Sequence, residues 1–444
     1  MKLSFAAATD VGRQRQHNED NFLIDPQLNL FVVADGMGGH AAGEVASQLA
    51  IHEISRIVRE NGEFAERYAK TQDLEARQAV LRMLDHAVQS ACALIHDTGK
   101  SDANKRGMGT TTSALLIAGD RGFIAHVGDS RVYLLRGAQL HQLTEDHSLI
   151  NELIRRGKIR RDELEGSPYA RFKNAVTRAV GANESVEADT FDFEVLPGDA
   201  FLLCSDGLHQ YLSDGDARLG PILSGDLEAA PSTLVELANS AGGSDNITAV
   251  VVRSETSTAA DGMARVADLK NRVDLLAKLA LFRYLSYKEI IRVLNVTTTR
   301  DVKPGDAIFR EGESGDALYV LLAGKVHLVK DGVEVATLER GAHFGEMALV
   351  DRSPRSAAAI VADPSRVLSL SRRDFYQIVR NEPALATKLL WSFVQSLTER
   401  LRKTTSDLSD AKFAADAIEL SPGDDAVFLE EPTRSRPPPH PPRV

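Results

Sequence analysis

Acidic side chains occur in five short turns spread across the first half of the sequence. The turns read His17-Asn18-Glu19-Asp20, Ala34-Asp35-Gly36, Gly128-Asp129-Ser130, Ser205-Asp206-Gly207 and Ser244-Asp245-Asn246. Each acid lies at or just after an apolar run that is typical of a strand, and strand ends can direct several carboxylates at one point. Oxygen-only ligands from separate strands suit hard divalent ions such as Mg²⁺ and Mn²⁺. The pattern therefore indicates a metal-dependent hydrolase.

The elements that would position these turns are clustered strands with long helices between them. Apolar runs predict strands over residues 31–34, 113–118, 122–127, 131–135, 200–204 and 247–252. Helical patterns occupy residues 43–60, 73–96 and 148–156. Such clustering favours an α+β fold over a strictly alternating α/β fold.

The composition is that of a globular protein with two or three domains. The 444 residues exceed one ordinary domain, and the net charge of −11 argues against a nucleic-acid partner, which requires a basic face. The two cysteines, Cys92 and Cys204, lie in apolar surroundings, which favours buried thiols over a disulfide. No apolar run approaches the roughly 20 residues that cross a membrane. We therefore expect a cytoplasmic protein without a membrane partner.

The second half of the sequence has a different pattern. Small polar residues at 254–262 are typical of a linker, and residues 263–294 have helical periodicity. From 302 to 370, short β-type runs alternate with glycine turns, which predicts an antiparallel barrel or jelly roll. A helical stripe covers 374–408, and a proline-rich stretch follows. We therefore divide the chain into a domain at 1–254, a linker at 255–270, a domain at 271–412 and a disordered tail at 413–444.

In order and spacing, the acidic turns of residues 1–254 resemble those of the metal-dependent protein phosphatase family, often called type 2C, in its bacterial branch. The resemblance implies a central β-sandwich flanked by helices. It also implies two Mn²⁺ or Mg²⁺ ions and a weak third ion. Asp35 would bridge the first two ions. The other implied ligands are Glu19, the carbonyl of Gly36, Asp206, Asp245 and, for the third ion, Asp129.

The same resemblance assigns two catalytic residues and a substrate. Arg15 matches the arginine that grips the substrate phosphate, a task for which the guanidinium fork is well suited. His40 matches the histidine that protonates the departing serine or threonine oxygen. The implied reaction is hydrolysis of phosphoserine and phosphothreonine in proteins by a water activated between two ions. Gln210 departs from the pattern, because many relatives carry there an acid that supports the third ion.

A second motif lies between residues 344 and 358. The stretches Phe344-Gly345-Glu346-Met347-Ala348-Leu349 and Ser353-Pro354-Arg355-Ser356 resemble the phosphate-binding cassette of cyclic-nucleotide-binding domains, which implies a β-roll or jelly roll with flanking helices. Free N–H groups at 345–349 would attract a phosphate, and a guanidinium would pair with its charge. The ligand implied is cAMP or cGMP. The predicted contacts are Gly345, Glu346, Met347, Ala348, Arg355 and Ser356.

Together the two motifs predict a serine/threonine protein phosphatase that a cyclic nucleotide modulates. The alternative is a sensor or adaptor whose catalytically weak phosphatase fold binds phosphoproteins, an interpretation that Gln210 favours. A transcription regulator is disfavoured, because the chain after residue 408 is too short and proline-rich for a helix-turn-helix. The sequence leaves a homodimer open and identifies neither the substrate protein nor the direction of regulation.

Overall fold

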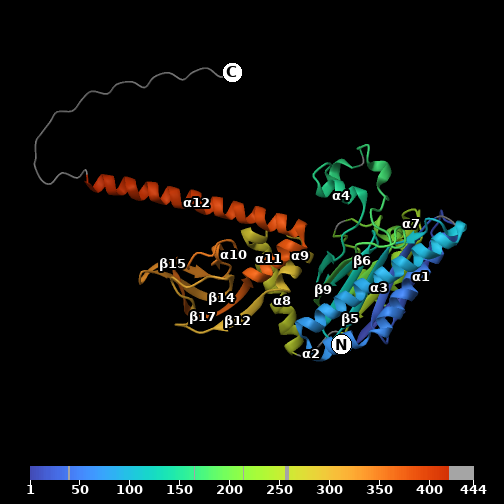
Figure 1. Ribbon diagram of the computed structural model, residues 1–444, viewed down its shortest axis with the longest axis horizontal. Coiled ribbons are helices and arrows are strands. Elements are labelled where there is room, and N and C mark those ends of the chain that lie inside the picture. Colours follow the sequence, from blue (N-terminus) through green and yellow to red (C-terminus); the bar gives the residue numbers. More distant parts are fainter. Residues whose placement is uncertain (39–40, 165, 214, 256–259, 420–444) are drawn as a thin grey trace, which may run out of the picture.

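The computed structural model has two parts joined by helices (Figure 1). It describes residues 1–38, 41–164, 166–213, 215–255 and 260–419. The first part layers helices on sheets, and the second is a smaller antiparallel sheet with helices beside it. A long helix, α12 (Pro383–Glu419), extends past the smaller sheet. The predicted α+β fold is confirmed.

Two antiparallel sheets pack face to face in the first part. One has the spatial order β1 (Leu3–Asp10), β11 (Ile247–Ser254), β10 (Ala200–Cys204), β7 (Arg131–Arg136) and β8 (Gln139–Gln142). The other has the order β2 (Asp20–Asp25), β3 (Leu30–Met37), β5 (Thr112–Ala118), β6 (Arg121–Val127) and β9 (Asp189–Glu194), with β4 (Gly109–Thr110) beside β3. The core between them includes the fully buried Phe31, Ile124, Leu203 and Val250. The predicted β-sandwich is therefore confirmed.

Helices cover both outer faces of the sandwich. One face carries α1 (Ala41–Glu60), α2 (Glu63–Thr71) and α3 (Leu74–Ser101). The other carries α5 (Asp206–His209), α6 (Leu219–Ser224) and α7 (Ala230–Ser240). Along the chain, the 3₁₀ turn η1 (Ala103–Lys105) follows α3. Between β8 and β9 the sequence forms α4 (Leu149–Arg155) and the 3₁₀ turns η2 (Arg161–Glu163) and η3 (Ala170–Phe172). The predicted strands and helices of this part are present. The apolar runs do not predict β1, β2, β8 and β9, in which polar residues accompany the apolar ones, or the two-residue β4. The helical patterns also do not predict the shorter helices α2, α5, α6 and α7.

Antiparallel pairing brings the acidic turns to one edge of the sandwich. Asp35 in β3 lies opposite Asp20, the first residue of β2. Asp206 follows β10, whereas Asp245 precedes β11, the strand that pairs with β10. In an antiparallel pair the end of one strand lies beside the start of its neighbour. The expectation that each acid lies at or after its strand is therefore wrong for Asp245 and Glu19, which precede theirs.

The second part is an antiparallel sheet with bent strands. Its spatial order is β12 (Thr298–Val302), β17 (Ala358–Ser371), β14 (Ala317–Lys330) and β15 (Val333–Glu339), with β13 (Ala307–Phe309) on β17 and β16 (His343–Phe344) on β14. The register of β14 against β17 shifts three times between Leu321 and Val326. Such bulges bend strands, as a roll requires. The predicted jelly roll is confirmed.

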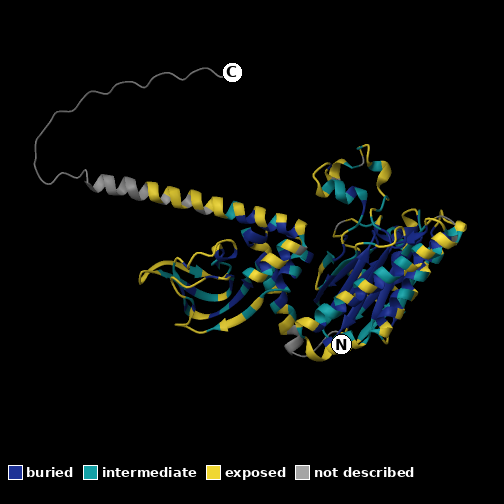
Figure 2. Cartoon of the chain, viewed as in Figure 1, coloured by how far each residue is buried: buried dark blue, intermediate teal, exposed yellow. Residues whose placement is uncertain are grey.

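A continuous apolar core connects the two parts (Figure 2). The connecting elements are α8 (Ala260–Lys278), η4 (Ala280–Phe282) and α9 (Tyr287–Leu294). Leu276 and Phe282 are buried in the same cluster as Phe193 of the sandwich. Burying one such side chain contributes about 1.5–3 kcal/mol. Within the expected linker, 255–270, the residues from Ala260 onward therefore lie in α8, which packs against the sandwich.

The helical segment expected at 374–408 consists of two helices. α11 (Arg372–Asn381) ends before Glu382, and α12 begins at Pro383. Proline lacks an N–H and has a fixed φ, so it can begin a helix but breaks one that it interrupts. α12 continues to Glu419, into the segment 413–444 that we expected to be a tail. The remaining residues of that segment, 420–444, lie outside the described residues.

Two expectations drawn from composition can be compared with the structure directly. Cys92 and Cys204 are fully buried free thiols, as predicted. Burial raises the pKa of the Cys204 thiol to about 12, so it is protonated and unreactive at neutral pH. None of the helices in the described part of the chain combines the length and apolar character that a membrane span requires.

Candidate metal centre and nucleotide pocket

Carboxylates converge at the edge of the sandwich where β2, β3, β10 and β11 meet. Burial, and then the charges of surrounding acids, raise the pKa of Asp35 well above its usual range. Those acids come from four turns and are Asp20, Asp206, Asp129 and Asp245. Burial followed by neighbouring carboxylates also raises the pKa of Asp206 to about 6 and that of Asp129 to about 8. Mutual repulsion of this kind is what a divalent cation removes.

Asp20 belongs to this cluster, although the sequence analysis gives it no role. It is buried, and its Oδ2 accepts hydrogen bonds from Ser205 Oγ and Thr248 Oγ1, both at 2.7 Å. Burial raises the pKa of Asp20 to about 7, and the two hydrogen bonds partly offset that rise. The signal in the sequence is its position directly after Glu19, in a turn already singled out.

Glu19 and Gly36, predicted to share one ligand shell, lie side by side. The Gly36 N–H donates to the Glu19 carbonyl at 3.1 Å. A Cβ on Gly43 would lie 2.5 Å from Glu19 Oε2, so only glycine leaves room for this carboxylate near the start of α1. Asn246, which sequence reasoning missed, fixes the loop before β2. Its Oδ1 accepts from the Glu19 N–H at 2.8 Å, and its Nδ2 donates to two carbonyls at 2.9 Å.

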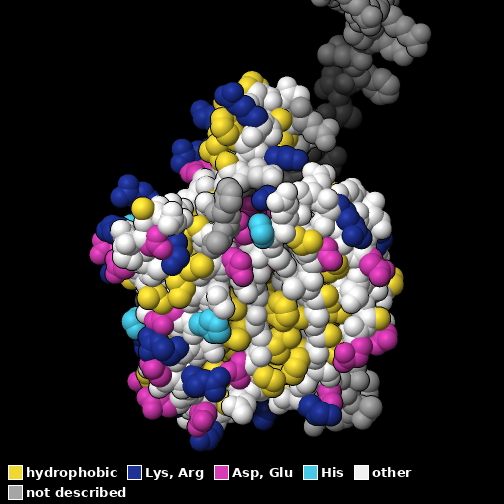
Figure 3. All heavy atoms as spheres, turned by 90° about the vertical axis from the view of Figure 1, so that its right-hand side faces the viewer, with side chains coloured by type: hydrophobic (Ala, Val, Ile, Leu, Met, Phe, Trp, Pro, Cys, Tyr) yellow, Lys and Arg dark blue, Asp and Glu magenta, His cyan; other side chains and the backbone are white. Residues whose placement is uncertain are grey.

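Arg15 lies beside the carboxylate cluster. Its Nη2 donates to Asp245 Oδ2 at 2.7 Å, and 49% of its side chain is exposed. Gln210 Oε1 accepts a hydrogen bond at 3.2 Å from the serine that precedes Asp245. His40 lies outside the described residues. On the face of this part shown in Figure 3, acidic, basic and histidine side chains lie close together around a hollow, above a band of apolar side chains.

The oxygen donors of the cluster fit a hard divalent ion. The Oδ1 atoms of Asp20 and Asp206 are buried and have no hydrogen-bond partner within the described ranges. A bound ion would supply that partner and would neutralise the repelling charges. As the side chains stand, no three His, Cys, Asp or Glu groups among the described residues are arranged to hold an ion. Binding would therefore draw the carboxylates closer together.

Arg355 is the charged residue of the predicted nucleotide pocket. It is buried, and its NH groups donate to the carbonyls of Gly345 at 3.0 Å and Ala317 at 2.9 Å. Its guanidinium carbon lies 4.1 Å from the centre of the Phe309 ring. Its Nε is buried without a hydrogen-bond partner in the part of the chain that the structure describes. The pocket therefore holds a buried cation with donor capacity for a phosphate oxygen.

Glycines make room for this arginine. A Cβ on Gly345, whose φ is +73°, would lie 2.6 Å from Arg355 Nη1, and one on Gly315 would lie 2.8 Å from the guanidinium carbon. The helix that follows, α10 (Met347–Val350), is a single turn. The phosphate site expected at its start thus depends mainly on Arg355. Of the other predicted contacts, two are buried, Glu346 and Ala348, and two are exposed, Met347 and Ser356.

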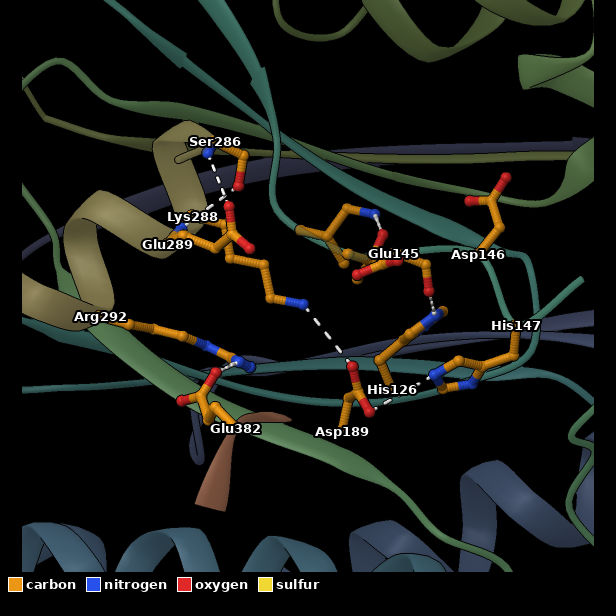
Figure 4. A network of polar contacts seen from close by, with 12 residues as sticks. His126, Glu145, Asp146, His147, Asp189, Ser286, Lys288, Glu289, Arg292 and Glu382 are labelled. Carbon is orange, nitrogen blue, oxygen red and sulfur yellow. Dashed lines mark hydrogen bonds and ion pairs between the residues drawn. The ribbon is translucent and has the colours of Figure 1, made fainter. Parts of the chain in front are cut away.

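A polar network connects α9 with the turn that carries Asp129 (Figure 4). Lys288 Nζ lies 3.6 Å from Asp189 Oδ2, and Asp189 Oδ1 lies 3.4 Å from His147 Nε2. His147 Nδ1 in turn accepts a hydrogen bond at 3.1 Å from the N–H of Gly128. Burial alone would raise the pKa of Asp189, but the bond to His147 and the charge of Lys288 hold it well below its usual range. The sequence contains no signal for this network, because its members are far apart.

The other side of α9 is held by the C-terminal helices. Arg292 forms an ion pair with Glu382, which lies between α11 and α12. Lys388 Nζ of α12 lies 2.8 Å from Glu289 Oε2, and Glu289 forms the capping box of α9 with Ser286. Contacts therefore continue from α12, through α9, to the edge of the sandwich where the acids converge.

Comparisons with known proteins find a similar family for each of the two parts of the chain. A family model described as protein phosphatase 2C matches residues 11–233, and one described as cyclic nucleotide-binding domain matches residues 299–382. Protein phosphatase PhpP of Streptococcus pneumoniae is 35% identical over 255 residues, which cover 56% of this chain and 97% of that protein.

Two solved structures are similar to the first part. The crystal structure of a bacterial serine phosphatase is 30% identical, with a TM-score of 0.50, and the match covers 58% of this chain and 100% of that chain. The catalytic domain of the serine/threonine protein phosphatase PstP, solved in complex with two manganese ions, is 36% identical, with a TM-score of 0.48. That match covers 56% of this chain and 97% of the other.

Proposed function

The chain belongs to the protein phosphatase 2C family and is a metal-dependent serine/threonine protein phosphatase, and from this premise we propose that its carboxylate cluster is the catalytic centre. The observation that carries the proposal is the convergence of Asp35 with acids from four other strand ends, where the pKa values of Asp35, Asp129 and Asp206 are raised. When bound, Mn²⁺ or Mg²⁺ ions would supply an acidic water and charge stabilisation for the phosphoryl group.

The described carboxylates divide into two sets around Asp35. Asp35 would contribute to both of two ion sites. Glu19 and the Gly36 carbonyl, which lie side by side, would complete one site. Asp206 and Asp245, which flank the paired strands β10 and β11, would complete the other. Because paired strands hold the main chain beside these acids, ion binding would move mainly their side chains.

Substrate contacts would come from the rim of the cluster. Arg15 is half exposed and would turn from Asp245 toward the phosphate of the substrate once ions neutralise that carboxylate. His40 would donate a proton to the departing serine or threonine oxygen. Asp129 would bind a weak third ion, which Gln210 supports less well than an acid would. We propose phosphoserine and phosphothreonine in proteins as substrates, and residues 1–254 as the catalytic domain.

The test is hydrolysis of a small phosphate ester and of a phosphorylated protein by the full-length chain. We expect Mn²⁺ to support both reactions and a chelator to abolish them. Binding of the phosphorylated protein without hydrolysis, in the presence of Mn²⁺, would overturn the catalytic proposal in favour of a phosphoprotein-binding adaptor. The ester separates these outcomes, because it needs no docking surface outside the catalytic centre.

We further propose that cAMP or cGMP binds in the domain at 271–412 and modulates the phosphatase. A ligand that moved the cassette around Arg355 would displace α11, which bonds to α10 through Arg372, and with it α12, which packs on α11. Those helices hold α9 through Arg292 and Lys388. Through Lys288, α9 holds Asp189 and hence the turn that carries Asp129. The apolar core shared by both parts makes α9 a rigid connection.

Nucleotide titration of the phosphatase rate tests the modulation. Coupling free energies of about 1–3 kcal/mol are typical, so saturating nucleotide should change kcat/KM for a phosphorylated protein by roughly 5- to 150-fold. By reciprocity, a phosphoprotein that prefers one state should change nucleotide affinity by the same factor. Equal kcat/KM with and without bound nucleotide would mean that the C-terminal domain serves only to localise the enzyme.

A further inference from the structure

We propose that a basic cleft beside α11 is a second nucleotide site, which binds a nucleoside polyphosphate. The cleft has a volume of about 690 Å³ and lies where α11 meets the end of α10 and the loop that follows it. Pockets of roughly 300–1,000 Å³ hold small ligands. Most of the charged lining residues are arginines, namely Arg352, Arg372, Arg373 and Arg380.

One face of α11 presents two of these arginines to the cleft. Arg373, Gln377 and Arg380 share that face, because residues three and four apart lie one above the other on a helix. On the opposite face, Phe375 and Ile378 are buried, so the helix is held by its apolar side. From Arg373 to Arg380 the helix rises about 10 Å. The two guanidinium groups can therefore contact successive phosphates of one chain.

Arg372 is fixed at the other side of the cleft. Its Nε donates to the carbonyl of Ala348 at 2.5 Å, and its Nη2 donates to the carbonyls of Gly315 and Asp351, both at 2.7 Å. These neutral acceptors orient the guanidinium but leave its positive charge in place. Its Nη1 forms no hydrogen bond within the described ranges, so a donor remains for an anionic ligand.

The charge of the cleft is not balanced by nearby acids. Among the described residues, none pairs its carboxylate with one of the four arginines. Asp351 and Asp374 accept hydrogen bonds from neighbouring serines, and Glu382 forms an ion pair with Arg292. Like charges around one hollow repel one another, and a bound anion removes that repulsion. Because a single phosphate group carries at most about two negative charges, several linked phosphates match the cleft better.

Tyr376 and Gln377 indicate that the ligand carries a base as well as phosphates. Tyr376 is 42% exposed, and its ring packs edge-on against buried Phe375, with the ring centres 6.0 Å apart. The ring is thus anchored to the core and still open for stacking with a base. Beside it, the Gln377 amide can both donate to and accept from the edge of a base. Val350, which is exposed, adds an apolar contact.

Calorimetric titration of the full-length protein with ATP and with GTP tests the proposal, in a chelator that keeps the metal centre empty. We expect one nucleotide to bind per chain. Arg373→Gln with Arg380→Gln removes two positive charges and should weaken binding at least about tenfold. Arg82→Gln with Arg340→Gln is the matched control, because it removes the same charge at exposed positions outside the cleft. It should change affinity less than about twofold. Equal midpoints of thermal unfolding verify that each variant is folded.

Two further variants identify the site and the contact with the base. Arg355→Ala removes the cation of the cyclic-nucleotide pocket and should leave ATP binding intact. Tyr376→Leu should weaken ATP binding about fivefold or more, whereas the binding of inorganic tripolyphosphate should not change. Tripolyphosphate that binds the wild type as tightly as both nucleotides would overturn the contact with a base.

Three results would overturn the second nucleotide site itself. One is the failure of both ATP and GTP to bind at about 1 mM. Another is ATP binding that Arg355→Ala abolishes but Arg373→Gln with Arg380→Gln leaves unchanged, which would place the nucleotide in the cyclic-nucleotide pocket. The third is binding of a phosphopeptide, lost in the same double variant, when neither nucleotide binds. That result would identify the cleft as a docking site for phosphoproteins.

Discussion

The two ligand sites of this chain differ in the sign of their charge and in how far apart in the sequence their residues lie. The catalytic edge gathers carboxylates from turns that are far apart, so that the Glu19 N–H bonds to Asn246, 227 residues away. The nucleotide pocket is local, because its predicted contacts lie between Gly345 and Ser356. One site concentrates negative charge that repels itself. In the other, main-chain carbonyls already accept some of the hydrogen bonds that a single cation, Arg355, can donate.

This difference indicates how each site depends on its ligand. Raised pKa values mark the carboxylate cluster as incompletely stabilised without cations. Removing a ligand group there should abolish a reaction that needs both ions. The arginine pocket holds its geometry through backbone contacts and glycines, so loss of one group should weaken binding without unfolding the cassette.

The largest effect should follow from Asp35→Asn. An amide keeps the shape of the side chain but cannot supply the charge that two ions share, so kcat/KM should fall at least about 100-fold. Steady-state hydrolysis of a phosphopeptide with Mn²⁺ measures the loss. Glu228→Gln, in an exposed turn before α7, is the matched control and should behave as the wild type. Retention of more than about a tenth of the activity would contradict a bridging role.

Arg355→Ala should have an intermediate effect on the other site. A hydrogen bond to a charged group contributes about 1.5–3 kcal/mol, so affinity for cAMP or cGMP should fall roughly ten- to hundredfold. Calorimetry on the full-length wild type and variant measures the dissociation constant of each nucleotide. Arg352→Ala removes an exposed arginine from the same loop and should change affinity less than about twofold. If the wild type binds neither nucleotide at millimolar concentration, the pocket has another role.

Metal affinity should rise with pH through the range in which the cluster titrates. Asp206, with a pKa of about 6, and Asp129, with a pKa of about 8, must lose protons before they can bind an ion. Because protons compete below these values, the affinity for Mn²⁺ should increase about tenfold or more between pH 6 and pH 8. Calorimetry in two buffers should detect proton release at pH 6 that nearly disappears at pH 9. A pH-independent affinity would show that these carboxylates are not ligands.

The smallest effect should follow from Lys288→Met, which breaks the contact between α9 and Asp189 but keeps a long apolar side chain. Substitutions along such networks change coupling by about 0.5–2 kcal/mol, so the nucleotide effect on kcat/KM should shrink a few-fold. The phosphatase rate with and without nucleotide gives the coupling directly. Lys278→Met, at the exposed end of α8, is the control. Unchanged coupling in Lys288→Met would exclude this route between the two sites.

Much of the molecule could be predicted because the residues that indicate its folds and sites stand together in short turns and motifs. Short polar turns, most of them after apolar runs, marked the acids, and short motifs marked the cassette, so both folds and most proposed ligands could be named. Asp20 and Asn246 were missed although they adjoin named residues, because their roles depend on partners across the sheet. Lys288, Asp189 and His147 had no signal, since a lone lysine, aspartate or histidine is usually a solvated surface residue.

Local turns and periodicity in the sequence encode the fold class, the order of the two parts and the residue types at each site. Contacts between distant segments determine which carboxylates share one edge, which helix connects the two parts and which face of α12 stays exposed. Antiparallel pairing brings the carboxylates to one edge, since it places the start of β11 beside the end of β10. Packing of α9 and α12 into a shared core determines the connecting helix and the exposed face of α12, because burial of apolar surface depends on contacts between distant segments.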